Sequence, residues 1–282
     1  MIHLGLIGYP LSHSMSPQLH AAAFQALGME GEYQLYAVAP GDRQGLAKLT
    51  ERLRKGELQG LNVTIPHKET ILPFLDDLTP SARVIGAVNT LCLNEDKLFG
   101  HNTDAPGFLA DVHRSFPQMA GEKEALVMGA GGAARAVVYA LLTDGWRVTL
   151  AVRRADVGQA AALIESMCGV AGRHSMRNVL LEPEALQPVL DGIRLLVNAT
   201  PLGMFPDVDN SPWPEGLPFP SRAAVYDLVY NPRETCLLQA ARIAGLCTGS
   251  GIGMLVEQAA LSFSCWTGKE PPREVMLATV EA

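Results

Sequence analysis

The sequence has 282 residues, enough for two domains of ordinary size. Its composition, 48% hydrophobic and 18% charged, is that of a globular protein and excludes a disordered chain. A net charge of -7 without any run of Lys and Arg argues against nucleic-acid binding. No stretch approaches the roughly 18 apolar residues of a membrane span, and the N-terminus lacks the basic start of a secretory signal. We therefore expect a soluble, cytoplasmic chain that does not enter a membrane.

Short strands and helices alternate through the first hundred residues. The order β-α-β-α-β predicts a mostly parallel sheet covered by helices. Ser16 followed by Pro17 is typical of an N-cap and a first helical position, so a helix should begin there. Strands are expected at 2–7, 33–38 and 58–65, and helices at 16–27 and 43–55.

A second series of strands and helices begins near residue 125. Its small-residue helix is expected at 132–143, and residues 207–220 are rich in proline and predict a surface loop. The sequence therefore predicts two α/β lobes, joined somewhere within residues 104–124. The strands of the second lobe are expected at 125–128, 147–152, 195–198 and 224–229.

A glycine-rich turn stands between the first strand and the first helix of the second lobe, and reads Gly129-Ala130-Gly131-Gly132-Ala133-Ala134. Such glycines bring backbone N–H groups close to a pyrophosphate, whose charge the helix N-terminus favours. Ala134 replaces the last glycine of the dinucleotide fingerprint, which that fingerprint allows. We expect a dinucleotide site here, and the alternative is a glycine-rich turn without a ligand.

Arg153 and Arg154 follow the next strand, 24 residues after Gly129 (153 − 129). An NAD site usually has an acid at about this place, whereas two guanidinium groups suit a 2′-phosphate. We expect NADP as the cofactor. The alternative for the two arginines is a solvated pair at the end of a strand. Because Asp156 is nearby and could bind ribose hydroxyls, NAD is the alternative cofactor.

Polar clusters of the first lobe point to a second ligand. Ser14 and Ser16 flank the start of a helix, where they could hold a carboxylate or only cap the helix. Asn62 and Thr64 lie at the C-terminal end of a predicted strand and Lys68 follows it, at the end where α/β proteins bind ligands. Taken alone, Lys68 is more typical of a solvated surface lysine than of an acid–base group. Further amides, hydroxyls and a carboxylate come from Gly86-Ala87-Val88-Asn89-Thr90 and from Gly100-His101-Asn102-Thr103-Asp104.

Metal and nucleophile chemistry find no support in the sequence. The seven histidines have no zinc-ligand spacing, and no G-x-S-x-G motif is present. The five cysteines form no C-x-x-C pair, so we expect thiols that bind no metal in a reducing compartment. Hydride transfer between a nicotinamide and a hydroxylated acid fits the motifs best.

Taken together, the motifs resemble those of the shikimate dehydrogenase family, nearly over the full length and in the family's order. They are G-Y-P-L-S-H-S-M-S-P, N-V-T-I-P-H-K, G-A-V-N-T, N-T-D-A-P-G-F, G-A-G-G-A-A-R-A, N-A-T-P-L-G-M, Y-D-L-V-Y-N-P and G-I-G-M-L-V-E-Q-A. The resemblance implies reversible, NADP-dependent reduction of 3-dehydroshikimate to shikimate, a step of aromatic amino-acid biosynthesis.

The resemblance also implies roles for individual residues. Lys68 and Asp104 would be the catalytic pair, with Asn62 and Asn102 behind them. Ser14 and Ser16 would hold the substrate carboxylate. The ring hydroxyls would be bound by Thr64, Asn89, Tyr230 and Gln258. The cofactor would be bound by Gly129, Ala130, Gly131, Gly132, Ala133, Arg153, Arg154, Leu228 and Gly251.

The family's fold implies a three-layer α/β substrate lobe and a Rossmann-type dinucleotide-binding lobe. Because its C-terminal helices return to the first lobe, the substrate domain would comprise 1–104 and 255–282 and the NADP domain 105–254. Both ligands would occupy the cleft between the lobes, whose closure would exclude water. The enzyme would be a monomer or a homodimer.

Two positions depart from the family's pattern. NADP-using relatives usually read Asn-Arg-Ser/Thr where this chain has Val152-Arg153-Arg154, and a further arginine falls on Val157, so use of NAD as well stays open. Ala21 stands where the family often has asparagine, which we interpret as a packing change. The alternatives are a quinate/shikimate dehydrogenase that also uses NAD, and a ligand sensor, which would not need both Lys68 and Asp104.

Overall fold

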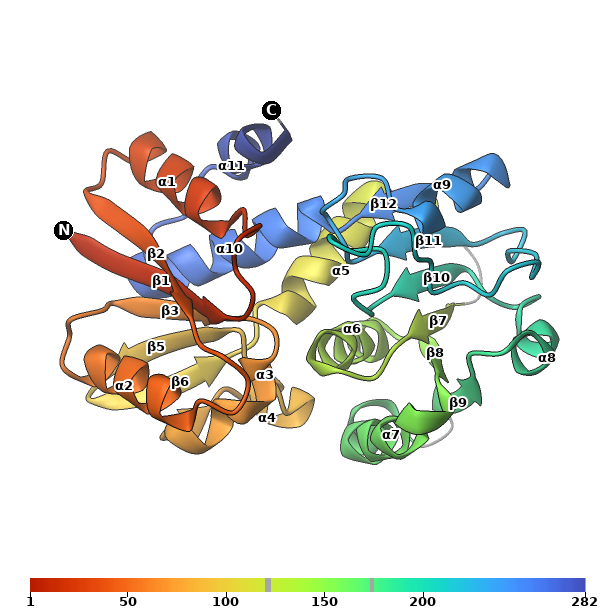
Figure 1. Cartoon of the computed structure of the whole chain (residues 1–282), viewed down its shortest axis with the longest axis horizontal. Coiled ribbons are helices and arrows are strands. Elements are labelled where there is room, and N and C mark those ends of the chain that lie inside the picture. Colours follow the sequence, from red (N-terminus) through yellow and green to blue (C-terminus); the bar gives the residue numbers. More distant parts are fainter. Residues whose placement is uncertain (120–122, 173–174, 282) are drawn as a thin grey trace. The chain divides into compact units, whose positions relative to one another are not determined.

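A computed structural model describes residues 1–119, 123–172 and 175–281 (Figure 1). Two six-stranded sheets with helices packed on them confirm the expected α/β class. The chain divides into two units, Met1–Gly107 with Leu255–Ala282 and Phe108–Met254. The predicted join at 104–124 includes residues 120–122, which lie outside the described residues.

The sheet of the first unit has the strand order β2-β1-β3-β5-β6-β4. The sheet is mostly parallel, as expected, because β2, β1, β3, β6 and β4 run in one direction. The exception in this sheet is β5, which is antiparallel to its neighbours β3 and β6. Glu95 and Asp96 join β5 to β6 with φ of 46° and 66°, the backbone of a tight hairpin turn. The strands are β1 (Ile2–Gly8), β2 (Gly31–Ala37), β3 (Gly60–Val63), β4 (Asp77–Leu78), β5 (Thr90–Asn94) and β6 (Lys97–His101).

Helices cover both faces of this sheet (Figure 1). On one face, α2 (Arg43–Arg54) buries Leu46, Leu49 and Leu53, which recur at helical spacing, against the strands. The other face carries α1 (Ser16–Ala26) and α10 (Ile252–Thr267), with α11 (Arg273–Glu281) packed on α1. The remaining segments are α3 (His67–Thr70), the 3₁₀ turn η1 (Leu72–Phe74), α4 (Pro80–Ile85) and the first turn of α5 (Asp104–Ser115).

The start of α1 differs by one residue from the expectation. Ser16 is already helical and Met15 is the N-cap, without a side-chain hydrogen bond. The serine hydroxyl that hydrogen-bonds to the backbone at the start of α1 is Ser14 Oγ, which accepts from the Ser16 N–H at 3.3 Å. The Ser16 hydroxyl is therefore not the cap that the sequence suggested.

The sheet of the second unit is parallel throughout, in the order β12-β11-β10-β7-β8-β9. Numbered within this unit and taken from β9, the order is 3-2-1-4-5-6, which is the Rossmann arrangement, so the expected Rossmann-type lobe is confirmed. The strands are β7 (Glu124–Met128), β8 (Arg147–Val152), β9 (Met176–Leu180), β10 (Leu195–Asn198), β11 (Ala224–Asp227) and β12 (Thr248–Ser250).

Apolar residues of strands and helices form a buried cluster in this unit, and the proline-rich segment 207–220 contributes to it. Trp213 is buried and its Nε1 donates to the Leu217 carbonyl at 2.9 Å, so this segment is not only a surface loop as expected. The helical segments are α6 (Gly132–Thr143), η2 (Arg154–Asp156), α7 (Val157–Ala171), α8 (Pro183–Leu186), η4 (Gln187–Val189) and α9 (Cys236–Ile243).

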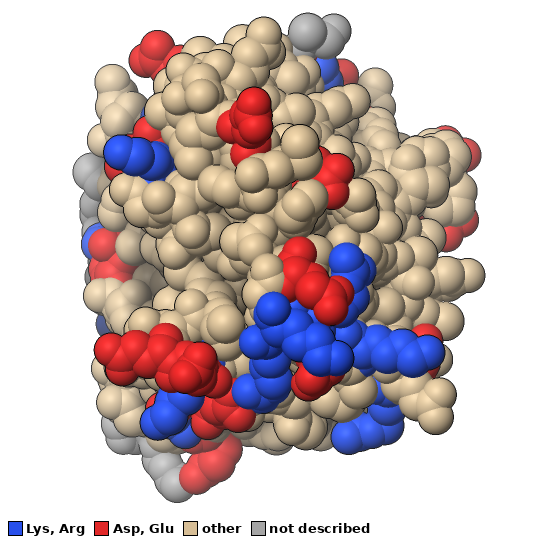
Figure 2. Space-filling model, turned by 90° about the vertical axis from the view of Figure 1, so that its left-hand side faces the viewer, with Lys and Arg blue, Asp and Glu red and all other residues tan. Residues whose placement is uncertain are grey.

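Charges on the surface are mixed in sign. Figure 2 shows a group of Lys and Arg side chains on one face, with Asp and Glu side chains beside them. Ion pairs of α2 follow this pattern, with Arg54 2.5 Å from Asp76 and Arg52 3.1 Å from Glu57. Within the described ranges, every helix is too short or too polar to cross a bilayer.

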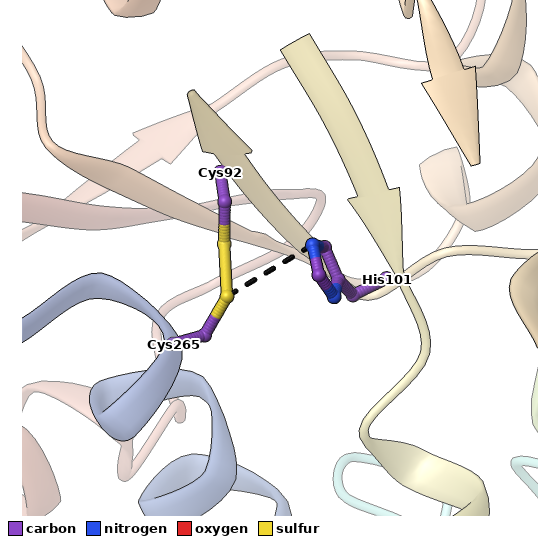
Figure 3. Close-up of side chains that lie close together, drawn as sticks. All are labelled: Cys92, His101 and Cys265. Atoms are coloured by element: carbon purple, nitrogen blue, oxygen red, sulfur yellow. Dashed lines mark hydrogen bonds between the residues drawn. A yellow bond between two sulfur atoms is a disulfide. The ribbon is translucent and has the colours of Figure 1, made fainter. Parts of the chain in front are cut away.

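The cysteines depart from the expectation of five unpaired thiols. Cys92 and Cys265 are joined by a disulfide (Figure 3), whereas Cys168, Cys236 and Cys247 are free. The two paired residues are 173 positions apart, so the pairing depends on how α10 lies against β5.

His20 lies in the aromatic layer between α1, α10 and the sheet. Its ring is stacked on Tyr33 with centroids 4.2 Å apart, and it also contacts Phe263 and Trp266. Neither ring nitrogen has a hydrogen-bond partner of ordinary geometry among the described residues. Burial lowers the pKa of His20 to about 3, and the nearby Asn62 amide offsets only part of this effect.

Replacing His20 with leucine should flatten the acid dependence of stability. Below pH 6.5 His20 is protonated in the unfolded chain, whereas in the folded chain it stays neutral down to about pH 3. This group should therefore lower the free energy of unfolding of the wild type by about 1.4 kcal/mol for each pH unit between these values as the pH falls. Urea unfolding at about pH 7 and about pH 5 should show a smaller loss for His20→Leu than for wild type. The exposed control His113→Gln should behave like wild type, and equal losses in all three proteins would contradict this role of His20.

Candidate active site

Strand register gathers the polar residues of the first unit at one edge of the sheet. β1 and β3 are parallel and both end at this edge. The antiparallel β5 begins there, with Thr90 opposite Asn62, and β6 returns to it, with His101 opposite Thr90. The segments after β1, β3 and β6 and before β5 therefore meet at a single place.

Lys68 and Asp104 form an ion pair at this edge. Lys68 Nζ lies 2.6 Å from Asp104 Oδ2, and the two side chains are 14% and 6% exposed. The backbone of Lys68 is fixed because its carbonyl accepts from the Val88 N–H at 2.9 Å. The adjacent His67 is buried and donates from Nε2 to the Val38 carbonyl at 2.7 Å, which anchors α3. The pair is thus a positioned cation and anion, mostly removed from water.

Asn89 holds the second oxygen of Asp104. Its Nδ2 donates to Asp104 Oδ1 at 2.9 Å and to Thr103 Oγ1 at 2.8 Å, and it lies 3.3 Å from Gln258 Oε1. The Asn89 side-chain oxygen accepts from the Thr103 N–H at 2.8 Å. Both carboxylate oxygens of Asp104 therefore accept hydrogen bonds, and the carboxylate has a fixed orientation.

Asn102 fixes the backbone on which Asp104 stands. Its side-chain oxygen accepts from the Ala105 N–H at 3.1 Å at the start of α5, and its Nδ2 donates to the Ala87 carbonyl at 2.9 Å. One side chain thus satisfies a free donor of the helix start and ties it to the segment that precedes Asn89.

Three buried hydroxyls complete the network. Thr90 and Thr103 belong to the polar clusters predicted from the sequence, whereas Ser262 was not singled out. Thr90 Oγ1 lies 2.7 Å from Ser262 Oγ, and Thr103 Oγ1 lies 3.1 Å from the same atom. Asn62 Nδ2 donates to Ser262 Oγ at 3.0 Å and to the Asn89 carbonyl at 2.9 Å. Ser262 stands one helical turn after Gln258 in α10, a spacing that could have identified it.

Close packing of α5 against α10 brings Gln258 to the network. A Cβ at Gly107 would come within 2.9 Å of the Gln258 backbone nitrogen, so a side chain at this position would force the two helices apart. Gln258 is half-buried and its Nε2 donates to the Leu255 carbonyl at 2.8 Å. Its Oε1 therefore stays directed towards Asn89.

Thr64 lies at the same edge of the sheet, directly after β3. Its N–H donates to the Ile7 carbonyl at 2.8 Å, which places it beside the end of β1. Ser14 and Ser16 follow β1 at the start of α1, where Ser16 is buried and Ser14 is half-buried. The predicted site residues of the first unit therefore lie at strand ends or in segments that leave or enter the sheet at this edge, except Gln258, which α10 brings to it.

The glycine-rich turn of the second unit lies at the carboxyl end of β7, beside the switch point between β7 and β10. Gly129 has φ of 108°, which a side chain would strain, and its N–H donates to the Ala151 carbonyl at 3.1 Å. Gly131 is the N-cap of α6 and makes no side-chain cap hydrogen bond, while a Cβ added to it would meet no atom within 4 Å. This turn leaves open space in front of helical N–H groups.

Arg153 and Arg154 follow β8, the strand next to this turn. Arg153 Nε lies 2.7 Å from Asp156 Oδ2, and Arg154 lies 3.2 Å from Glu182. Both arginines are exposed. The Asp156 carboxylate raises the pKa of the Arg153 guanidinium, which stays a cation held close to the end of β8.

Leu228, Tyr230 and Gly251 gather beside the end of β11. The Gly251 N–H donates to the Val229 carbonyl at 3.4 Å, which places β12's end next to Leu228. Burial raises the pKa of the Tyr230 hydroxyl. Each of these residues belongs to the second unit.

A buried carboxylate, Asp227, organises this region and was not singled out from the sequence. It accepts from Asn198 Nδ2 at 2.8 Å, Thr235 Oγ1 at 2.6 Å and the Val229 N–H at 3.0 Å. Burial raises the pKa of Asp227 to about 6, and these hydrogen bonds lower it only in part. Asp227 joins β10, β11 and the segment before α9.

Comparison with known proteins identifies the family. A model of the shikimate dehydrogenase substrate binding domain matches residues 6–91, and a model of the shikimate 5'-dehydrogenase C-terminal domain matches residues 251–281. A shikimate dehydrogenase (NADP(+)) of Carboxydothermus hydrogenoformans is 41% identical over 272 residues, which cover 96% of this chain and 94% of that protein. The chain belongs to the shikimate dehydrogenase family.

Solved structures of related proteins agree in fold. Shikimate 5-dehydrogenase from Thermus thermophilus, in complex with NADP(H) and shikimate, has a TM-score of 0.85 at 39% identity, covering 100% of this chain and 99% of that chain. Quinate dehydrogenase from Corynebacterium glutamicum, in complex with NAD, has a TM-score of 0.87 at 34% identity, covering 99% and 98%. Shikimate dehydrogenases and a quinate dehydrogenase thus share the architecture of this chain.

Proposed function

We propose that this protein is a shikimate dehydrogenase that reversibly reduces 3-dehydroshikimate to shikimate with NADPH, a step of aromatic amino-acid biosynthesis. Relatives named shikimate dehydrogenase (NADP(+)), about 40% identical over nearly the full length, support this function. The structural observation that best supports this reaction is the ion pair of Lys68 and Asp104, whose side chains lie 2.6 Å apart and are mostly buried at the edge of the first sheet.

The residues of the second unit fit a dinucleotide. Gly129 to Ala133 would hold the pyrophosphate, because the open space at Gly131 and the N–H groups at the start of α6 suit an anion. Arg153 and Arg154 would hold the 2′-phosphate of NADP, and Leu228 and Gly251 would contact the nicotinamide end. When bound, NADP supplies the carbon that accepts or returns the hydride.

Substrate binding is proposed for residues around the ion pair. Ser14 and Ser16 would hold the carboxylate at the start of α1. Thr64, Asn89, Gln258 and Tyr230 would bind the ring hydroxyls. Asn89 Nδ2 already has three acceptors for two hydrogens, and Gln258 Oε1 is the most distant of them at 3.3 Å. A ring hydroxyl would therefore replace the Asn89–Gln258 contact at the lowest cost.

Lys68 is proposed to move the proton. As 3-dehydroshikimate is reduced, the Lys68 ammonium gives a proton to the C3 oxygen and becomes an amine. In the opposite direction the neutral Lys68 amine accepts the proton of the C3 hydroxyl and becomes an ammonium again. Asp104 orients Lys68 through Oδ2 and is itself oriented through Oδ1 by Asn89. Asn62 and Asn102 do not touch the reacting atoms in this proposal. Asn62 donates to the Asn89 carbonyl, and Asn102 accepts from the Ala105 N–H next to Asp104, so both hold the backbone of the site.

We further propose that residues 1–104 with 255–282 form the substrate domain and that 105–254 form the NADP domain. The division into Met1–Gly107 with Leu255–Ala282 and Phe108–Met254 supports these limits. A cytoplasmic location follows from a reaction that draws on a diffusible cofactor. A monomer or a homodimer is proposed, because one chain supplies the whole Lys68–Asp104 network.

A quinate/shikimate dehydrogenase is the second candidate, since quinate dehydrogenase from Corynebacterium glutamicum in complex with NAD is a structural neighbour. Purified protein should be assayed by absorbance of the reduced nicotinamide, with shikimate and quinate each combined with NADP and NAD. We expect a high rate only with shikimate and NADP. Comparable rates with quinate or NAD would favour the second candidate, and no rate from folded protein that binds nucleotide would contradict both.

Removing the proton-transfer group should affect turnover more than binding. In Lys68→Ala we expect kcat to fall by about 10²–10⁴-fold, while the KM for shikimate changes by less than about threefold. Steady-state kinetics would measure both constants. Lys48→Ala, an exposed lysine of α2, is the matched control and should keep both. A rise in KM as large as the fall in kcat would instead make Lys68 a binding residue.

Arg153 should determine the preference for NADP. Arg153→Ala removes a guanidinium expected at the 2′-phosphate, so the KM for NADP should rise by about tenfold while that for NAD stays nearly unchanged. The exposed Arg222→Ala in the same unit should leave both constants unchanged. An unaltered KM for NADP in Arg153→Ala would remove this residue from the phosphate site.

A further inference from the structure

Two cysteines and a histidine from three separate elements converge in the first unit (Figure 3). Cys92 lies in β5, His101 ends β6 and Cys265 lies near the end of α10. One ligand atom of each residue lies within 4.8 Å of the other two, and Cys265 Sγ is 3.9 Å from His101 Nε2. Nothing in the proposed reaction uses these three side chains.

We propose that Cys92, His101 and Cys265, with both cysteines reduced, form a binding site for a soft divalent metal ion of the Zn²⁺ class. Two thiolates and a neutral imidazole are the ligand types that such ions prefer over oxygen-rich sites. Two thiolates also balance the charge of a divalent ion, so binding leaves no net charge at the site.

The distance between Cys265 and His101 is close to that of two ligands of a tetrahedral ion. Zinc bonds of about 2.3 Å to sulfur and about 2.0 Å to nitrogen would separate a sulfur and a nitrogen ligand by about 3.6 Å. The Cys265 Sγ to His101 Nε2 distance of 3.9 Å is close to that value. The Cα atoms of Cys92 and Cys265 are 7.1 Å apart, beyond the about 4.4–6.8 Å that disulfides usually span, which leaves room for an ion between two thiolates.

The three side chains differ in their exposure to solvent. Cys92 is buried, His101 is half-buried and Cys265 is exposed. Burial lowers the pKa of His101, which favours the neutral imidazole that a metal ion needs as a ligand. The exposure of Cys265 gives the ion an entry path and lets a water molecule take the fourth position.

The disulfide and the bound ion are alternative states of the same two sulfur atoms. Reduction adds two electrons and two protons to the Cys92–Cys265 bond and yields two thiols, which lose their protons as the ion binds. A phosphine reductant provides these electrons and becomes a phosphine oxide with oxygen from water. The site therefore exists only in the reduced chain.

An ion here would join α10 to the β5–β6 hairpin. Gln258, Ser262 and Cys265 are spaced by four and three residues and so lie on one face of α10. On the same side, Trp266 Nε1 donates to the Leu91 carbonyl of β5 at 2.9 Å. Because the metal binds only the folded arrangement of these elements, it should raise the thermal midpoint of the chain.

Cobalt is the probe for this site. The full-length chain, reduced with a phosphine and stripped with a chelator, should bind one equivalent of Co²⁺ with a sulfur-to-cobalt charge-transfer band that Zn²⁺ abolishes. Cys265→Ser and His101→Asn should each weaken Co²⁺ binding by at least about 100-fold. Cys265 is exposed, so Cys265→Ser should fold normally, which circular dichroism and the thermal midpoint without metal would verify.

Cys247→Ser is the matched control, since it removes another exposed and free cysteine, and it should bind Co²⁺ like wild type. The proposal is overturned if the reduced wild type shows no charge-transfer band, or if Cys265→Ser keeps that band. Loss of the band in Cys247→Ser would equally overturn it. A disulfide that persists under the phosphine, with no Co²⁺ bound, would identify the pair as a permanent cross-link instead.

Discussion

The register of β3, β5 and β6 is the constraint on which the candidate active site depends. Asn62, Thr90 and His101 stand in one row across these strands. Because β5 and β6 form an antiparallel hairpin, the chain returns to the edge where β3 ended, and Asp104 meets Lys68 across 36 residues of sequence. A slip of one residue would turn these side chains to the opposite face of the sheet.

The two units treat charge in different ways. In the first unit Lys68 and Asp104 are mostly withdrawn from water, and Asn89, Thr103 and Ser262 satisfy the polar atoms around them. Such a network holds one geometry, since each buried group needs its partner. In the second unit the predicted anion-binding groups are backbone N–H groups and exposed arginines, while the buried carboxylate Asp227 holds strands together.

Several features were not predicted because they are decided by contacts between distant segments. The hairpin of β5 and β6 was missed since each strand is short and its polar ends read as loop motifs. The disulfide of Cys92 and Cys265, and the hydroxyl of Ser262, depend on where α10 docks. Trp213 is buried in a proline-rich segment whose composition indicates only a loop.

The sequence by itself determined the α/β class, the Rossmann-type lobe with its glycine-rich turn, and the family, because local patterns and ordered motifs carry that information. It also indicated Lys68 and Asp104 as partners, though only through the family resemblance. The tertiary structure alone decided that Asn89 orients Asp104, that Ser14 rather than Ser16 acts on the start of α1, and that Cys92, His101 and Cys265 converge. The physical reason is that hydrogen bonds and ligand geometry depend on distances of a few ångströms between residues that register and helix packing bring together.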